Sequence, residues 1–186
     1  MRKVVTQFMI SIDGFFEGPT REIDWHNVDA ELHNDVEEML KNADILLFGR
    51  VTYEMMAKYW PTEYAVTNDA VIANYMNSLP KIVFSKTLLD ASWNNTKVVK
   101  ENVEGVIREL KQQPGNGIIL LGSSDLAITL IPPGLIDEFR IIVNPVILGN
   151  GKSLFNGINK KYKLRLIKSR TFNSGNVLLN YKPADN

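Results

Sequence analysis

The feature that most constrains this fold is a strand that runs directly into a helix through a glycine and an arginine. Residues 45–48 are four consecutive apolar residues, which is typical of a strand buried on both faces. Gly49 and Arg50 follow, and a helical apolar pattern begins at Tyr53. The free N–H groups at a helix start attract anions, and a guanidinium beside them can bind a phosphate through two hydrogen bonds. The junction therefore predicts a phosphate site formed by Gly49, Arg50 and Thr52.

A second junction of the same kind follows the apolar run 118–121. That strand stops at Gly122, and the next helix opens with Ser123, Ser124, Asp125 and Leu126. In open α/β sheets, ligands bind at the carboxyl ends of such strands. Two junctions in one small α/β chain predict a ligand with phosphates at more than one point, as in a dinucleotide.

Each junction also has a purely structural interpretation. Serines are common helix N-caps, and a glycine between a strand and a helix can serve only to form the turn. Arg50 can pair with Glu54 one helical turn away instead of binding a phosphate. The sequence contains no G-x-G-x-x-G fingerprint and no P-loop, which disfavours ordinary Rossmann folds and nucleoside triphosphatases.

Composition limits the classes of partner. The 186 residues carry 21 Lys+Arg and 21 Asp+Glu, so we expect no nucleic acid and no anionic membrane as a partner. There is no cysteine and there are two histidines, which disfavours thiolate and multi-histidine metal sites, and we expect no metal. No apolar stretch has the length of a membrane span or the form of a signal peptide, so the expected location is the cytoplasm.

The order of the predicted elements gives the fold class. Strands and helices alternate through residue 131, and the rest of the chain is predicted as strands only. The alternating strands are at residues 3–12, 44–48, 81–85, 97–99 and 117–121. The first helix begins at residue 29, and the later helices occupy residues 50–59, 69–79, 103–112 and 124–131. The final strands are 137–148, 162–172 and 177–182. This pattern predicts one α/β domain over residues 1–186, with a mixed, mainly parallel sheet, helices on both faces and an antiparallel C-terminal edge.

Other candidate site residues lie on predicted loops. Ser85 and Lys86 directly follow a strand and would add a second cationic point for a 2′-phosphate; the alternative is a solvated turn. Asp13 and Gly14 follow the first strand, either as an ordinary turn or as a mobile loop that closes over a cofactor, and Asp13 is the nearest acidic candidate for proton delivery. Trp25, before the first helix, is a candidate wall of a substrate pocket or a core plug.

Together these segments resemble the dihydrofolate reductase-like superfamily, and within it the reductase domain of the riboflavin-biosynthesis deaminase–reductase. The similarity lies in residues 11–14, 47–54, 59–61, 84–88, 121–126 and 144–151, which span most of the chain in the expected order. The resemblance implies a three-layer fold with NADPH across the carboxyl ends of the strands. It also implies that Arg50 and Thr52 meet cofactor phosphates, that Ser85 and Lys86 lie near the adenosine ribose phosphate, and that residues 122–126 hold the pyrophosphate.

We therefore expect an NADPH-dependent reductase of a small polar substrate, similar to 5-amino-6-(5-phosphoribosylamino)uracil reductase. The alternatives are a non-catalytic NADPH sensor, a structural homodimer without cofactor, and dihydrofolate reductase activity. The last is disfavoured, because the position of the folate enzymes' substrate-binding carboxylate falls near His33, with Asp35 and Glu37 displaced. His33 is kept as a candidate substrate contact or a surface histidine.

The resemblance also implies a homodimer. Around residues 139–146 both faces of the predicted strand carry apolar side chains. One face is expected to pack within the chain, and the other to be exposed unless a second copy or the chain's own tail strands cover it.

Overall fold

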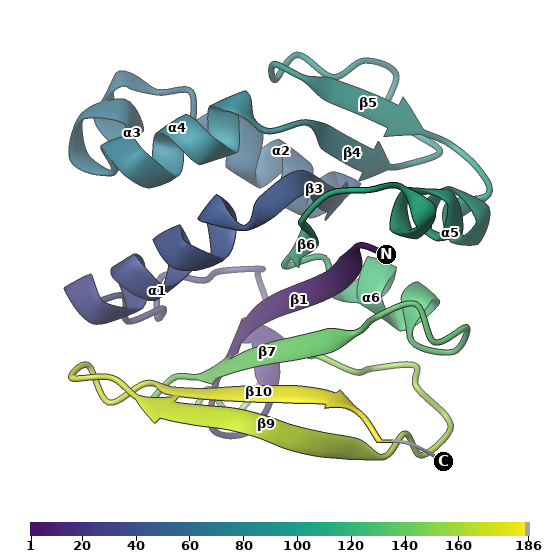
Figure 1. The fold of residues 1–186 in the computed structure, drawn as a ribbon. Coiled ribbons are helices and arrows are strands. Elements are labelled where there is room, and N and C mark those ends of the chain that lie inside the picture. The colour runs from purple at the N-terminus through teal and green to yellow at the C-terminus, as the bar shows by residue number, and fades with distance from the viewer. Residues whose placement is uncertain (185–186) are drawn as a thin grey trace.

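The computed structural model describes residues 1–184, which form ten strands and six helices (Figure 1). The strands are β1 (Lys3–Ile10), β2 (Phe15–Glu17), β3 (Ala43–Gly49), β4 (Lys81–Phe84), β5 (Thr96–Val99), β6 (Gly117–Leu121), β7 (Glu138–Val143), β8 (Lys152–Ser153), β9 (Leu164–Thr171) and β10 (Val177–Pro183). The helices are α1 (Ala30–Lys41), α2 (Arg50–Tyr59), α3 (Glu63–Asn68), α4 (Ala70–Ser78), α5 (Val103–Gln112) and α6 (Ser124–Leu130). No helix of this part of the chain is long and apolar enough to span a bilayer.

The main sheet has eight strands in the order β5-β4-β3-β6-β1-β7-β10-β9. All neighbours from β5 to β7 are parallel, and β10 is antiparallel to both β7 and β9. The predicted fold class is confirmed, including the antiparallel C-terminal edge. Because the parallel strands point the same way, the loops that follow β3, β4, β5 and β6 lie along one edge of the sheet (Figure 1).

Helices cover both faces of the sheet. On one face, α1, α2 and α4 pack on Leu46, Phe48 and Ile119. On the other, α5 and α6 pack on Leu47 and Leu120. Strands β3 and β6 are therefore buried on both faces, which explains their uninterrupted apolar sequences.

Several predicted boundaries are corrected. The first strand ends at Ile10 because the Ser11 N–H leaves the ladder and donates to the Phe15 carbonyl (2.9 Å). Strand β7 ends at Val143, since Pro145 has no N–H with which to continue the ladder. Helix α3 was missed because Pro61 indicated a stop, whereas Thr62 caps a new helix by accepting from the Ala65 N–H (3.2 Å). Strands β2 and β8, of three and two residues, were also missed.

The prediction of an exposed apolar face around residues 139–146 is also wrong for strand β7. Strand β7 lies inside the sheet, and Phe139, Ile141 and Ile142 are 4%, 8% and 0% exposed. Ile142 packs with Leu32 of α1 and Leu178 of β10. The chain covers both faces of β7 by itself.

Candidate functional site

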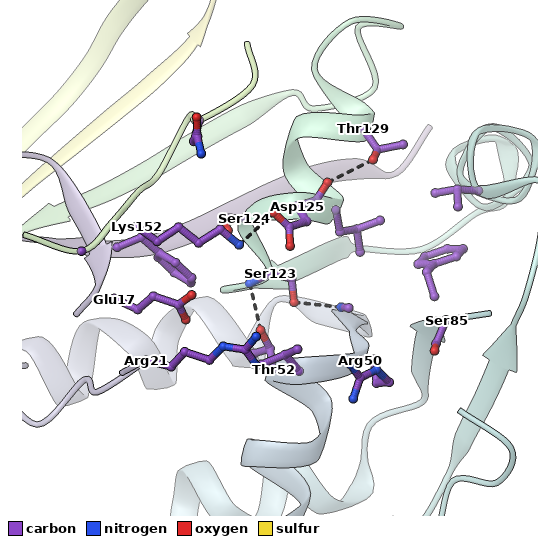
Figure 2. A pocket seen from close by; sticks show the side chains of 18 of the residues that line it. Glu17, Arg21, Arg50, Thr52, Ser85, Ser123, Ser124, Asp125, Thr129 and Lys152 are labelled. Carbon is purple, nitrogen blue, oxygen red and sulfur yellow. Dashed lines mark hydrogen bonds and ion pairs between the residues drawn. The ribbon is translucent and has the colours of Figure 1, made fainter. Parts of the chain in front are cut away.

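A cleft of about 830 Å³ lies along the carboxyl ends of the parallel strands (Figure 2). One wall follows β3, β4, β5 and β6, and includes the starts of α2 and α6. The opposite wall is formed by the short β2–β8 ribbon and its loops, residues 11–22 and 146–156, which we name the flap. The volume is within the range of pockets that bind small molecules and cofactors.

The two predicted junctions meet in this cleft and are bonded to each other. The Gly49 N–H donates to Ser123 Oγ (2.8 Å), and the Ser123 N–H donates to Thr52 Oγ1 (3.1 Å). Thr52 and Ser123 are 8% and 7% exposed. These two hydrogen bonds lock the start of α2 to the start of α6.

The second junction is strained where the first is not. Gly122 and Ser123 have left-handed backbones, with φ of +54° and +59°, whereas Gly49 has φ of −81°. The Gly122 N–H donates to the Gln7 carbonyl (3.1 Å), so it is already satisfied by β1. A Cβ at Gly122 would lie 3.2 Å from Thr52 Cγ2, and Gly122 itself does not line the cleft.

Positive charge is concentrated in the cleft, although the formal net charge of the whole chain is zero. Its lining contains five cations and two carboxylates. The cations are Arg21, Arg50, Lys86, Lys100 and Lys152, and the carboxylates are Glu17 and Asp125. A cleft with this excess of positive charge favours an anionic ligand.

Two of the five cations are paired within the chain. Arg50 Nη1 lies 2.9 Å from Glu54, which is the structural alternative that the sequence left open. Lys152 Nζ on the flap lies 2.8 Å from Asp125 at the start of α6. Among residues 1–184, no carboxylate lies within ion-pair distance of Arg21, Lys86 or Lys100.

Ser85 organises the loop that carries Lys86. Its Oγ accepts from the N–H groups of Thr87 (3.2 Å) and Leu88 (2.9 Å), which closes a tight turn after β4. Ser85 and Lys86 both line the cleft beside Arg50.

Asp13 holds the flap together. Its carboxylate accepts from the N–H groups of Leu148 (3.2 Å) and Gly149 (2.7 Å). The hydrogen bond with Ser11, followed by these backbone bonds, lowers the pKa of Asp13 below its usual value. Asp13 therefore stays ionised near neutral pH, and it is not among the residues that line the cleft.

Trp25 and His33 also lie away from the cleft lining. The Trp25 indole donates to the Glu22 carbonyl (3.2 Å) and packs edge-on against the His26 ring. Burial lowers the pKa of His26 to about 4, so this imidazole is neutral. His33 on α1 lies 3.5 Å from Glu37 and 3.8 Å from Asp69.

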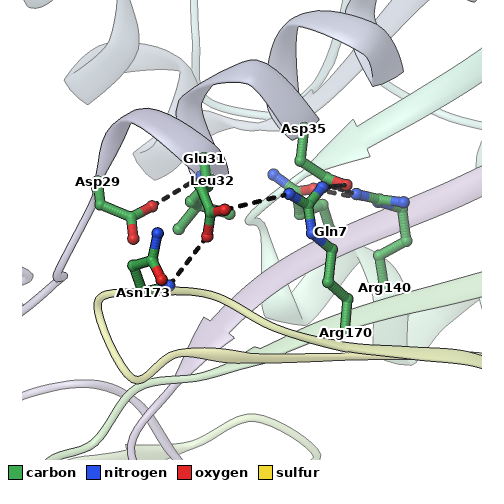
Figure 3. A network of polar contacts seen from close by, with 8 residues as sticks. All are labelled: Gln7, Asp29, Glu31, Leu32, Asp35, Arg140, Arg170 and Asn173. Atoms are coloured by element: carbon green, nitrogen blue, oxygen red, sulfur yellow. Dashed lines mark hydrogen bonds and ion pairs between the residues drawn. The ribbon is translucent and has the colours of Figure 1, made fainter.

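Two acidic residues of α1, Glu31 and Asp35, attach the helix to β7 and to the β9–β10 hairpin (Figure 3). Asp35 accepts from the Arg140 guanidinium of β7 and lies 3.7 Å from Arg170 of β9. Glu31 accepts from the Asn173 N–H (3.0 Å). Asp35 is thus held between α1 and the sheet by these two arginines, and it is not free to bind a heterocycle.

Two cations that the flap contributes to the cleft, Arg21 and Lys152, were not predicted from the sequence. Arg21 lies shortly after Gly18-Pro19, and Lys152 directly follows the segment 144–151 that carries part of the family resemblance; neither cation was among the predicted site residues. Pairing of β2 with β8 brings them to one wall. Of the predicted cofactor residues, all but Gly122 line the cleft.

The fold and the cleft define an α/β protein with a positively charged ligand site at the carboxyl ends of its parallel strands. The chain belongs to the RibD C-terminal domain family, whose model matches residues 2–178. It is 32% identical over 180 residues to the uncharacterized protein YyaP of Bacillus subtilis (strain 168), covering 97% of this chain and 94% of that protein.

Solved structures share the fold. The Thermotoga maritima diaminohydroxyphosphoribosylaminopyrimidine deaminase/5-amino-6-(5-phosphoribosylamino)uracil reductase aligns with a TM-score of 0.70 at 16% identity, over 98% of this chain and 57% of that one. Dihydrofolate reductase from Enterococcus faecalis, complexed with NADP(H), aligns with a TM-score of 0.64 at 14% identity, over 98% and 97%. The dihydrofolate reductase-like fold is therefore confirmed.

Proposed function

We propose that this chain is an NADPH-dependent reductase of a small polar substrate, and that it acts as 5-amino-6-(5-phosphoribosylamino)uracil reductases do. The observation that carries the proposal is the cleft, whose lining holds five cations in a chain with no net charge. Membership of the RibD C-terminal domain family and a structural neighbour with bound NADP(H) support a nicotinamide cofactor.

The residues present fit such a cofactor. Arg50, Lys86 and Lys100 provide positive charge near the ends of β3, β4 and β5, where they would hold the 2′-phosphate. Ser124, Asp125 and Leu126 line the adjoining wall, where their side chains and backbone would hold the pyrophosphate. When bound, the nicotinamide supplies the hydride, and the protein orients the substrate beside it.

Two groups of predicted cofactor residues take different roles in this proposal. Gly49, Thr52 and Ser123 keep the two helix starts in register through the hydrogen bonds that join them. Gly122 forms the turn before α6, with its N–H bonded to the Gln7 carbonyl of β1. Ser85 orients the loop of Lys86. They shape the phosphate site, and Arg50 and Lys86 supply its charge.

The role of Asp13 also changes. A carboxylate that is ionised near neutral pH is a poor proton donor, and Asp13 is already bound by two backbone N–H groups. We propose that Asp13 positions the flap and that water delivers the proton.

The test is turnover. NADPH oxidation is followed with a panel of phosphorylated and unphosphorylated aminopyrimidine ribosides. Dihydrofolate is tested in the same assay as the comparison substrate. We expect oxidation with a ribosylaminopyrimidine and none with dihydrofolate, because Asp35 is engaged by Arg140 and Arg170. Binding of NADPH without turnover on any substrate would favour the sensor, and oxidation with dihydrofolate would contradict our account of Asp35.

A homodimer is also proposed, with a different surface from the one that the sequence indicated. Leu164, Leu166 and Ile167 on the edge strand β9 are 39%, 47% and 47% exposed. Residues 156–184 contain seven Lys or Arg and no Asp or Glu, so two copies of this edge repel one another. A dimer through β9 should therefore tighten as salt screens the charges.

Light scattering at low micromolar concentration, repeated at rising salt, tests the dimer. We expect a mass approaching twice 21.0 kDa as salt increases. A monomer at every salt concentration would contradict the dimer.

We also retain the predictions of a cytoplasmic location and of no nucleic-acid partner. Retention of RNA or DNA by the protein in a filter-binding assay, through the basic segment 156–184, would contradict the prediction of no nucleic-acid partner.

A further inference from the structure

Arg21 is a cation that the proposed function leaves without a role. It lies on the flap, in a turn closed by bonds from the Gly18 N–H to the Glu22 carbonyl (3.0 Å) and from the Arg21 N–H to the Gly18 carbonyl (3.0 Å). Thr20 adds two bonds to the Glu22 carboxylate, of 2.8 and 2.7 Å. These bonds hold the Arg21 backbone at a left-handed φ of +67°, where a glycine would be less strained.

The Arg21 side chain extends from the flap toward the α2 wall, where Thr52 lies (Figure 2). Arg50 in that wall is paired with Glu54, and Lys152 on the flap is paired with Asp125. Glu17 is the other carboxylate of the cleft lining, and neither it nor any other carboxylate in residues 1–184 pairs with Arg21. The charge of Arg21 is therefore available to a ligand in the middle of the cleft.

The order of the strands separates this position from the 2′-phosphate end. Along the edge of the sheet, Lys100 follows β5, Lys86 follows β4, and the starts of α2 and α6 follow β3 and β6. Arg21 faces the last two from the opposite wall. A dinucleotide whose 2′-phosphate lies near Lys86 and Lys100 would place its pyrophosphate between the ends of β3 and β6.

Resting on the proposed function, we propose that Arg21 clamps the pyrophosphate of the cofactor from the flap. The clamp makes a contact common to NADPH and NADH, whereas Lys86 makes the contact that distinguishes them. Arg21 is in this account a positioning residue, because its contact draws the flap onto the cofactor.

The experiment compares Arg21→Ala with the wild-type chain by calorimetric titration of four ligands. NADPH, NADH and 2′-phospho-ADP-ribose contain the pyrophosphate, and adenosine 2′-monophosphate does not. We expect the first three to lose affinity by a similar factor of about tenfold or more, and the fourth to be unchanged. Arg165→Ala is the matched control, since it removes an exposed arginine of β9 that pairs with no carboxylate of residues 1–184, and it should alter none of the four.

The outcomes separate the clamp from the proposed function. Unchanged affinities, or an equal loss for adenosine 2′-monophosphate, would overturn the clamp while leaving NADPH binding intact. A loss confined to NADPH would also overturn it, because Arg21 would then contact the 2′-phosphate. A wild-type chain that binds none of the four would overturn the proposed function and the clamp with it.

Arg21→Gly distinguishes binding from folding. Glycine adopts a positive φ without strain, so the variant should be at least as resistant to denaturant as the wild type while losing the same affinity as Arg21→Ala. A variant that loses stability and affinity together would assign Arg21 to the structure of the turn and contradict the clamp.

Discussion

The two strand–glycine–helix junctions have similar sequences and different tasks. At the first, Gly49 has an ordinary backbone, and Arg50 carries a charge into the cleft. At the second, Gly122 and Ser123 are both left-handed, and their N–H groups are bonded to Gln7 and Thr52. The first junction supplies charge, and the second supplies the hydrogen bonds that fix the start of α6 to β1 and to the start of α2.

The difference shows why a glycine in such a motif does not by itself indicate contact with a ligand. Another residue could replace Gly49 without a steric clash, since a Cβ there would lie at an ordinary contact distance of 3.5 Å from Ser123 Cβ. Gly122 is required by its φ and by Thr52, although it does not line the cleft. The steric need for glycine is at Gly122, and the glycine that lines the cleft is Gly49.

The same substitution at both glycines should therefore have unequal costs. We expect Gly122→Ala to lower the free energy of unfolding by about 2 kcal/mol, from left-handed strain and the new contact with Thr52. Gly49→Ala should change it by less than about 0.5 kcal/mol. Urea denaturation measures both, and equal costs would remove the distinction between the junctions.

The adjacent residues Ser123 and Ser124 give a second, smaller contrast in stability. Ser123→Ala removes the acceptor of the Gly49 N–H and should cost about 1–2 kcal/mol in the free energy of unfolding. Ser124→Ala leaves that bond intact and should cost less than Ser123→Ala, while weakening NADPH binding at the proposed pyrophosphate site. Thermal denaturation and a binding titration of both variants would contradict the account if Ser124→Ala were the less stable protein.

Arg50 and Glu54 give the smallest effect on stability and an opposite effect on binding. Both Arg50→Ala and Glu54→Ala break an exposed i,i+4 pair, so each should cost about 0.5 kcal/mol or less. Arg50→Ala should weaken NADPH binding about tenfold, and Glu54→Ala should strengthen it slightly by releasing the guanidinium. If both variants bind NADPH like the wild type, Arg50 has only the structural role.

What could be predicted from the sequence was whatever depends on local pattern and parallel topology. The apolar runs of β3 and β6 predicted two buried neighbours, and their carboxyl ends brought Arg50, Thr52 and Ser124 to one cleft. The resemblance in these same segments led to the family that the comparisons then confirmed.

What could not be predicted depends on short, non-local pairings. Strands β2 and β8 are too short for a periodic signal, so nothing in the sequence placed Arg21 or Lys152 opposite α2. The bonds that Asp13 and Asp35 make cross more than 100 positions along the chain, to Gly149 and Arg140. Their carboxylates were candidates by residue type, and their partners decide what they do.

The central claim is that the cations of this cleft bind a phosphorylated dinucleotide. Calorimetric titration of the wild-type chain with NADPH and NADH tests it most directly. We predict that both bind, and that NADPH binds more than about tenfold tighter because Arg50, Lys86 and Lys100 meet its additional phosphate. Equal affinities would contradict that role for the three cations, and no binding of either would contradict the claim itself.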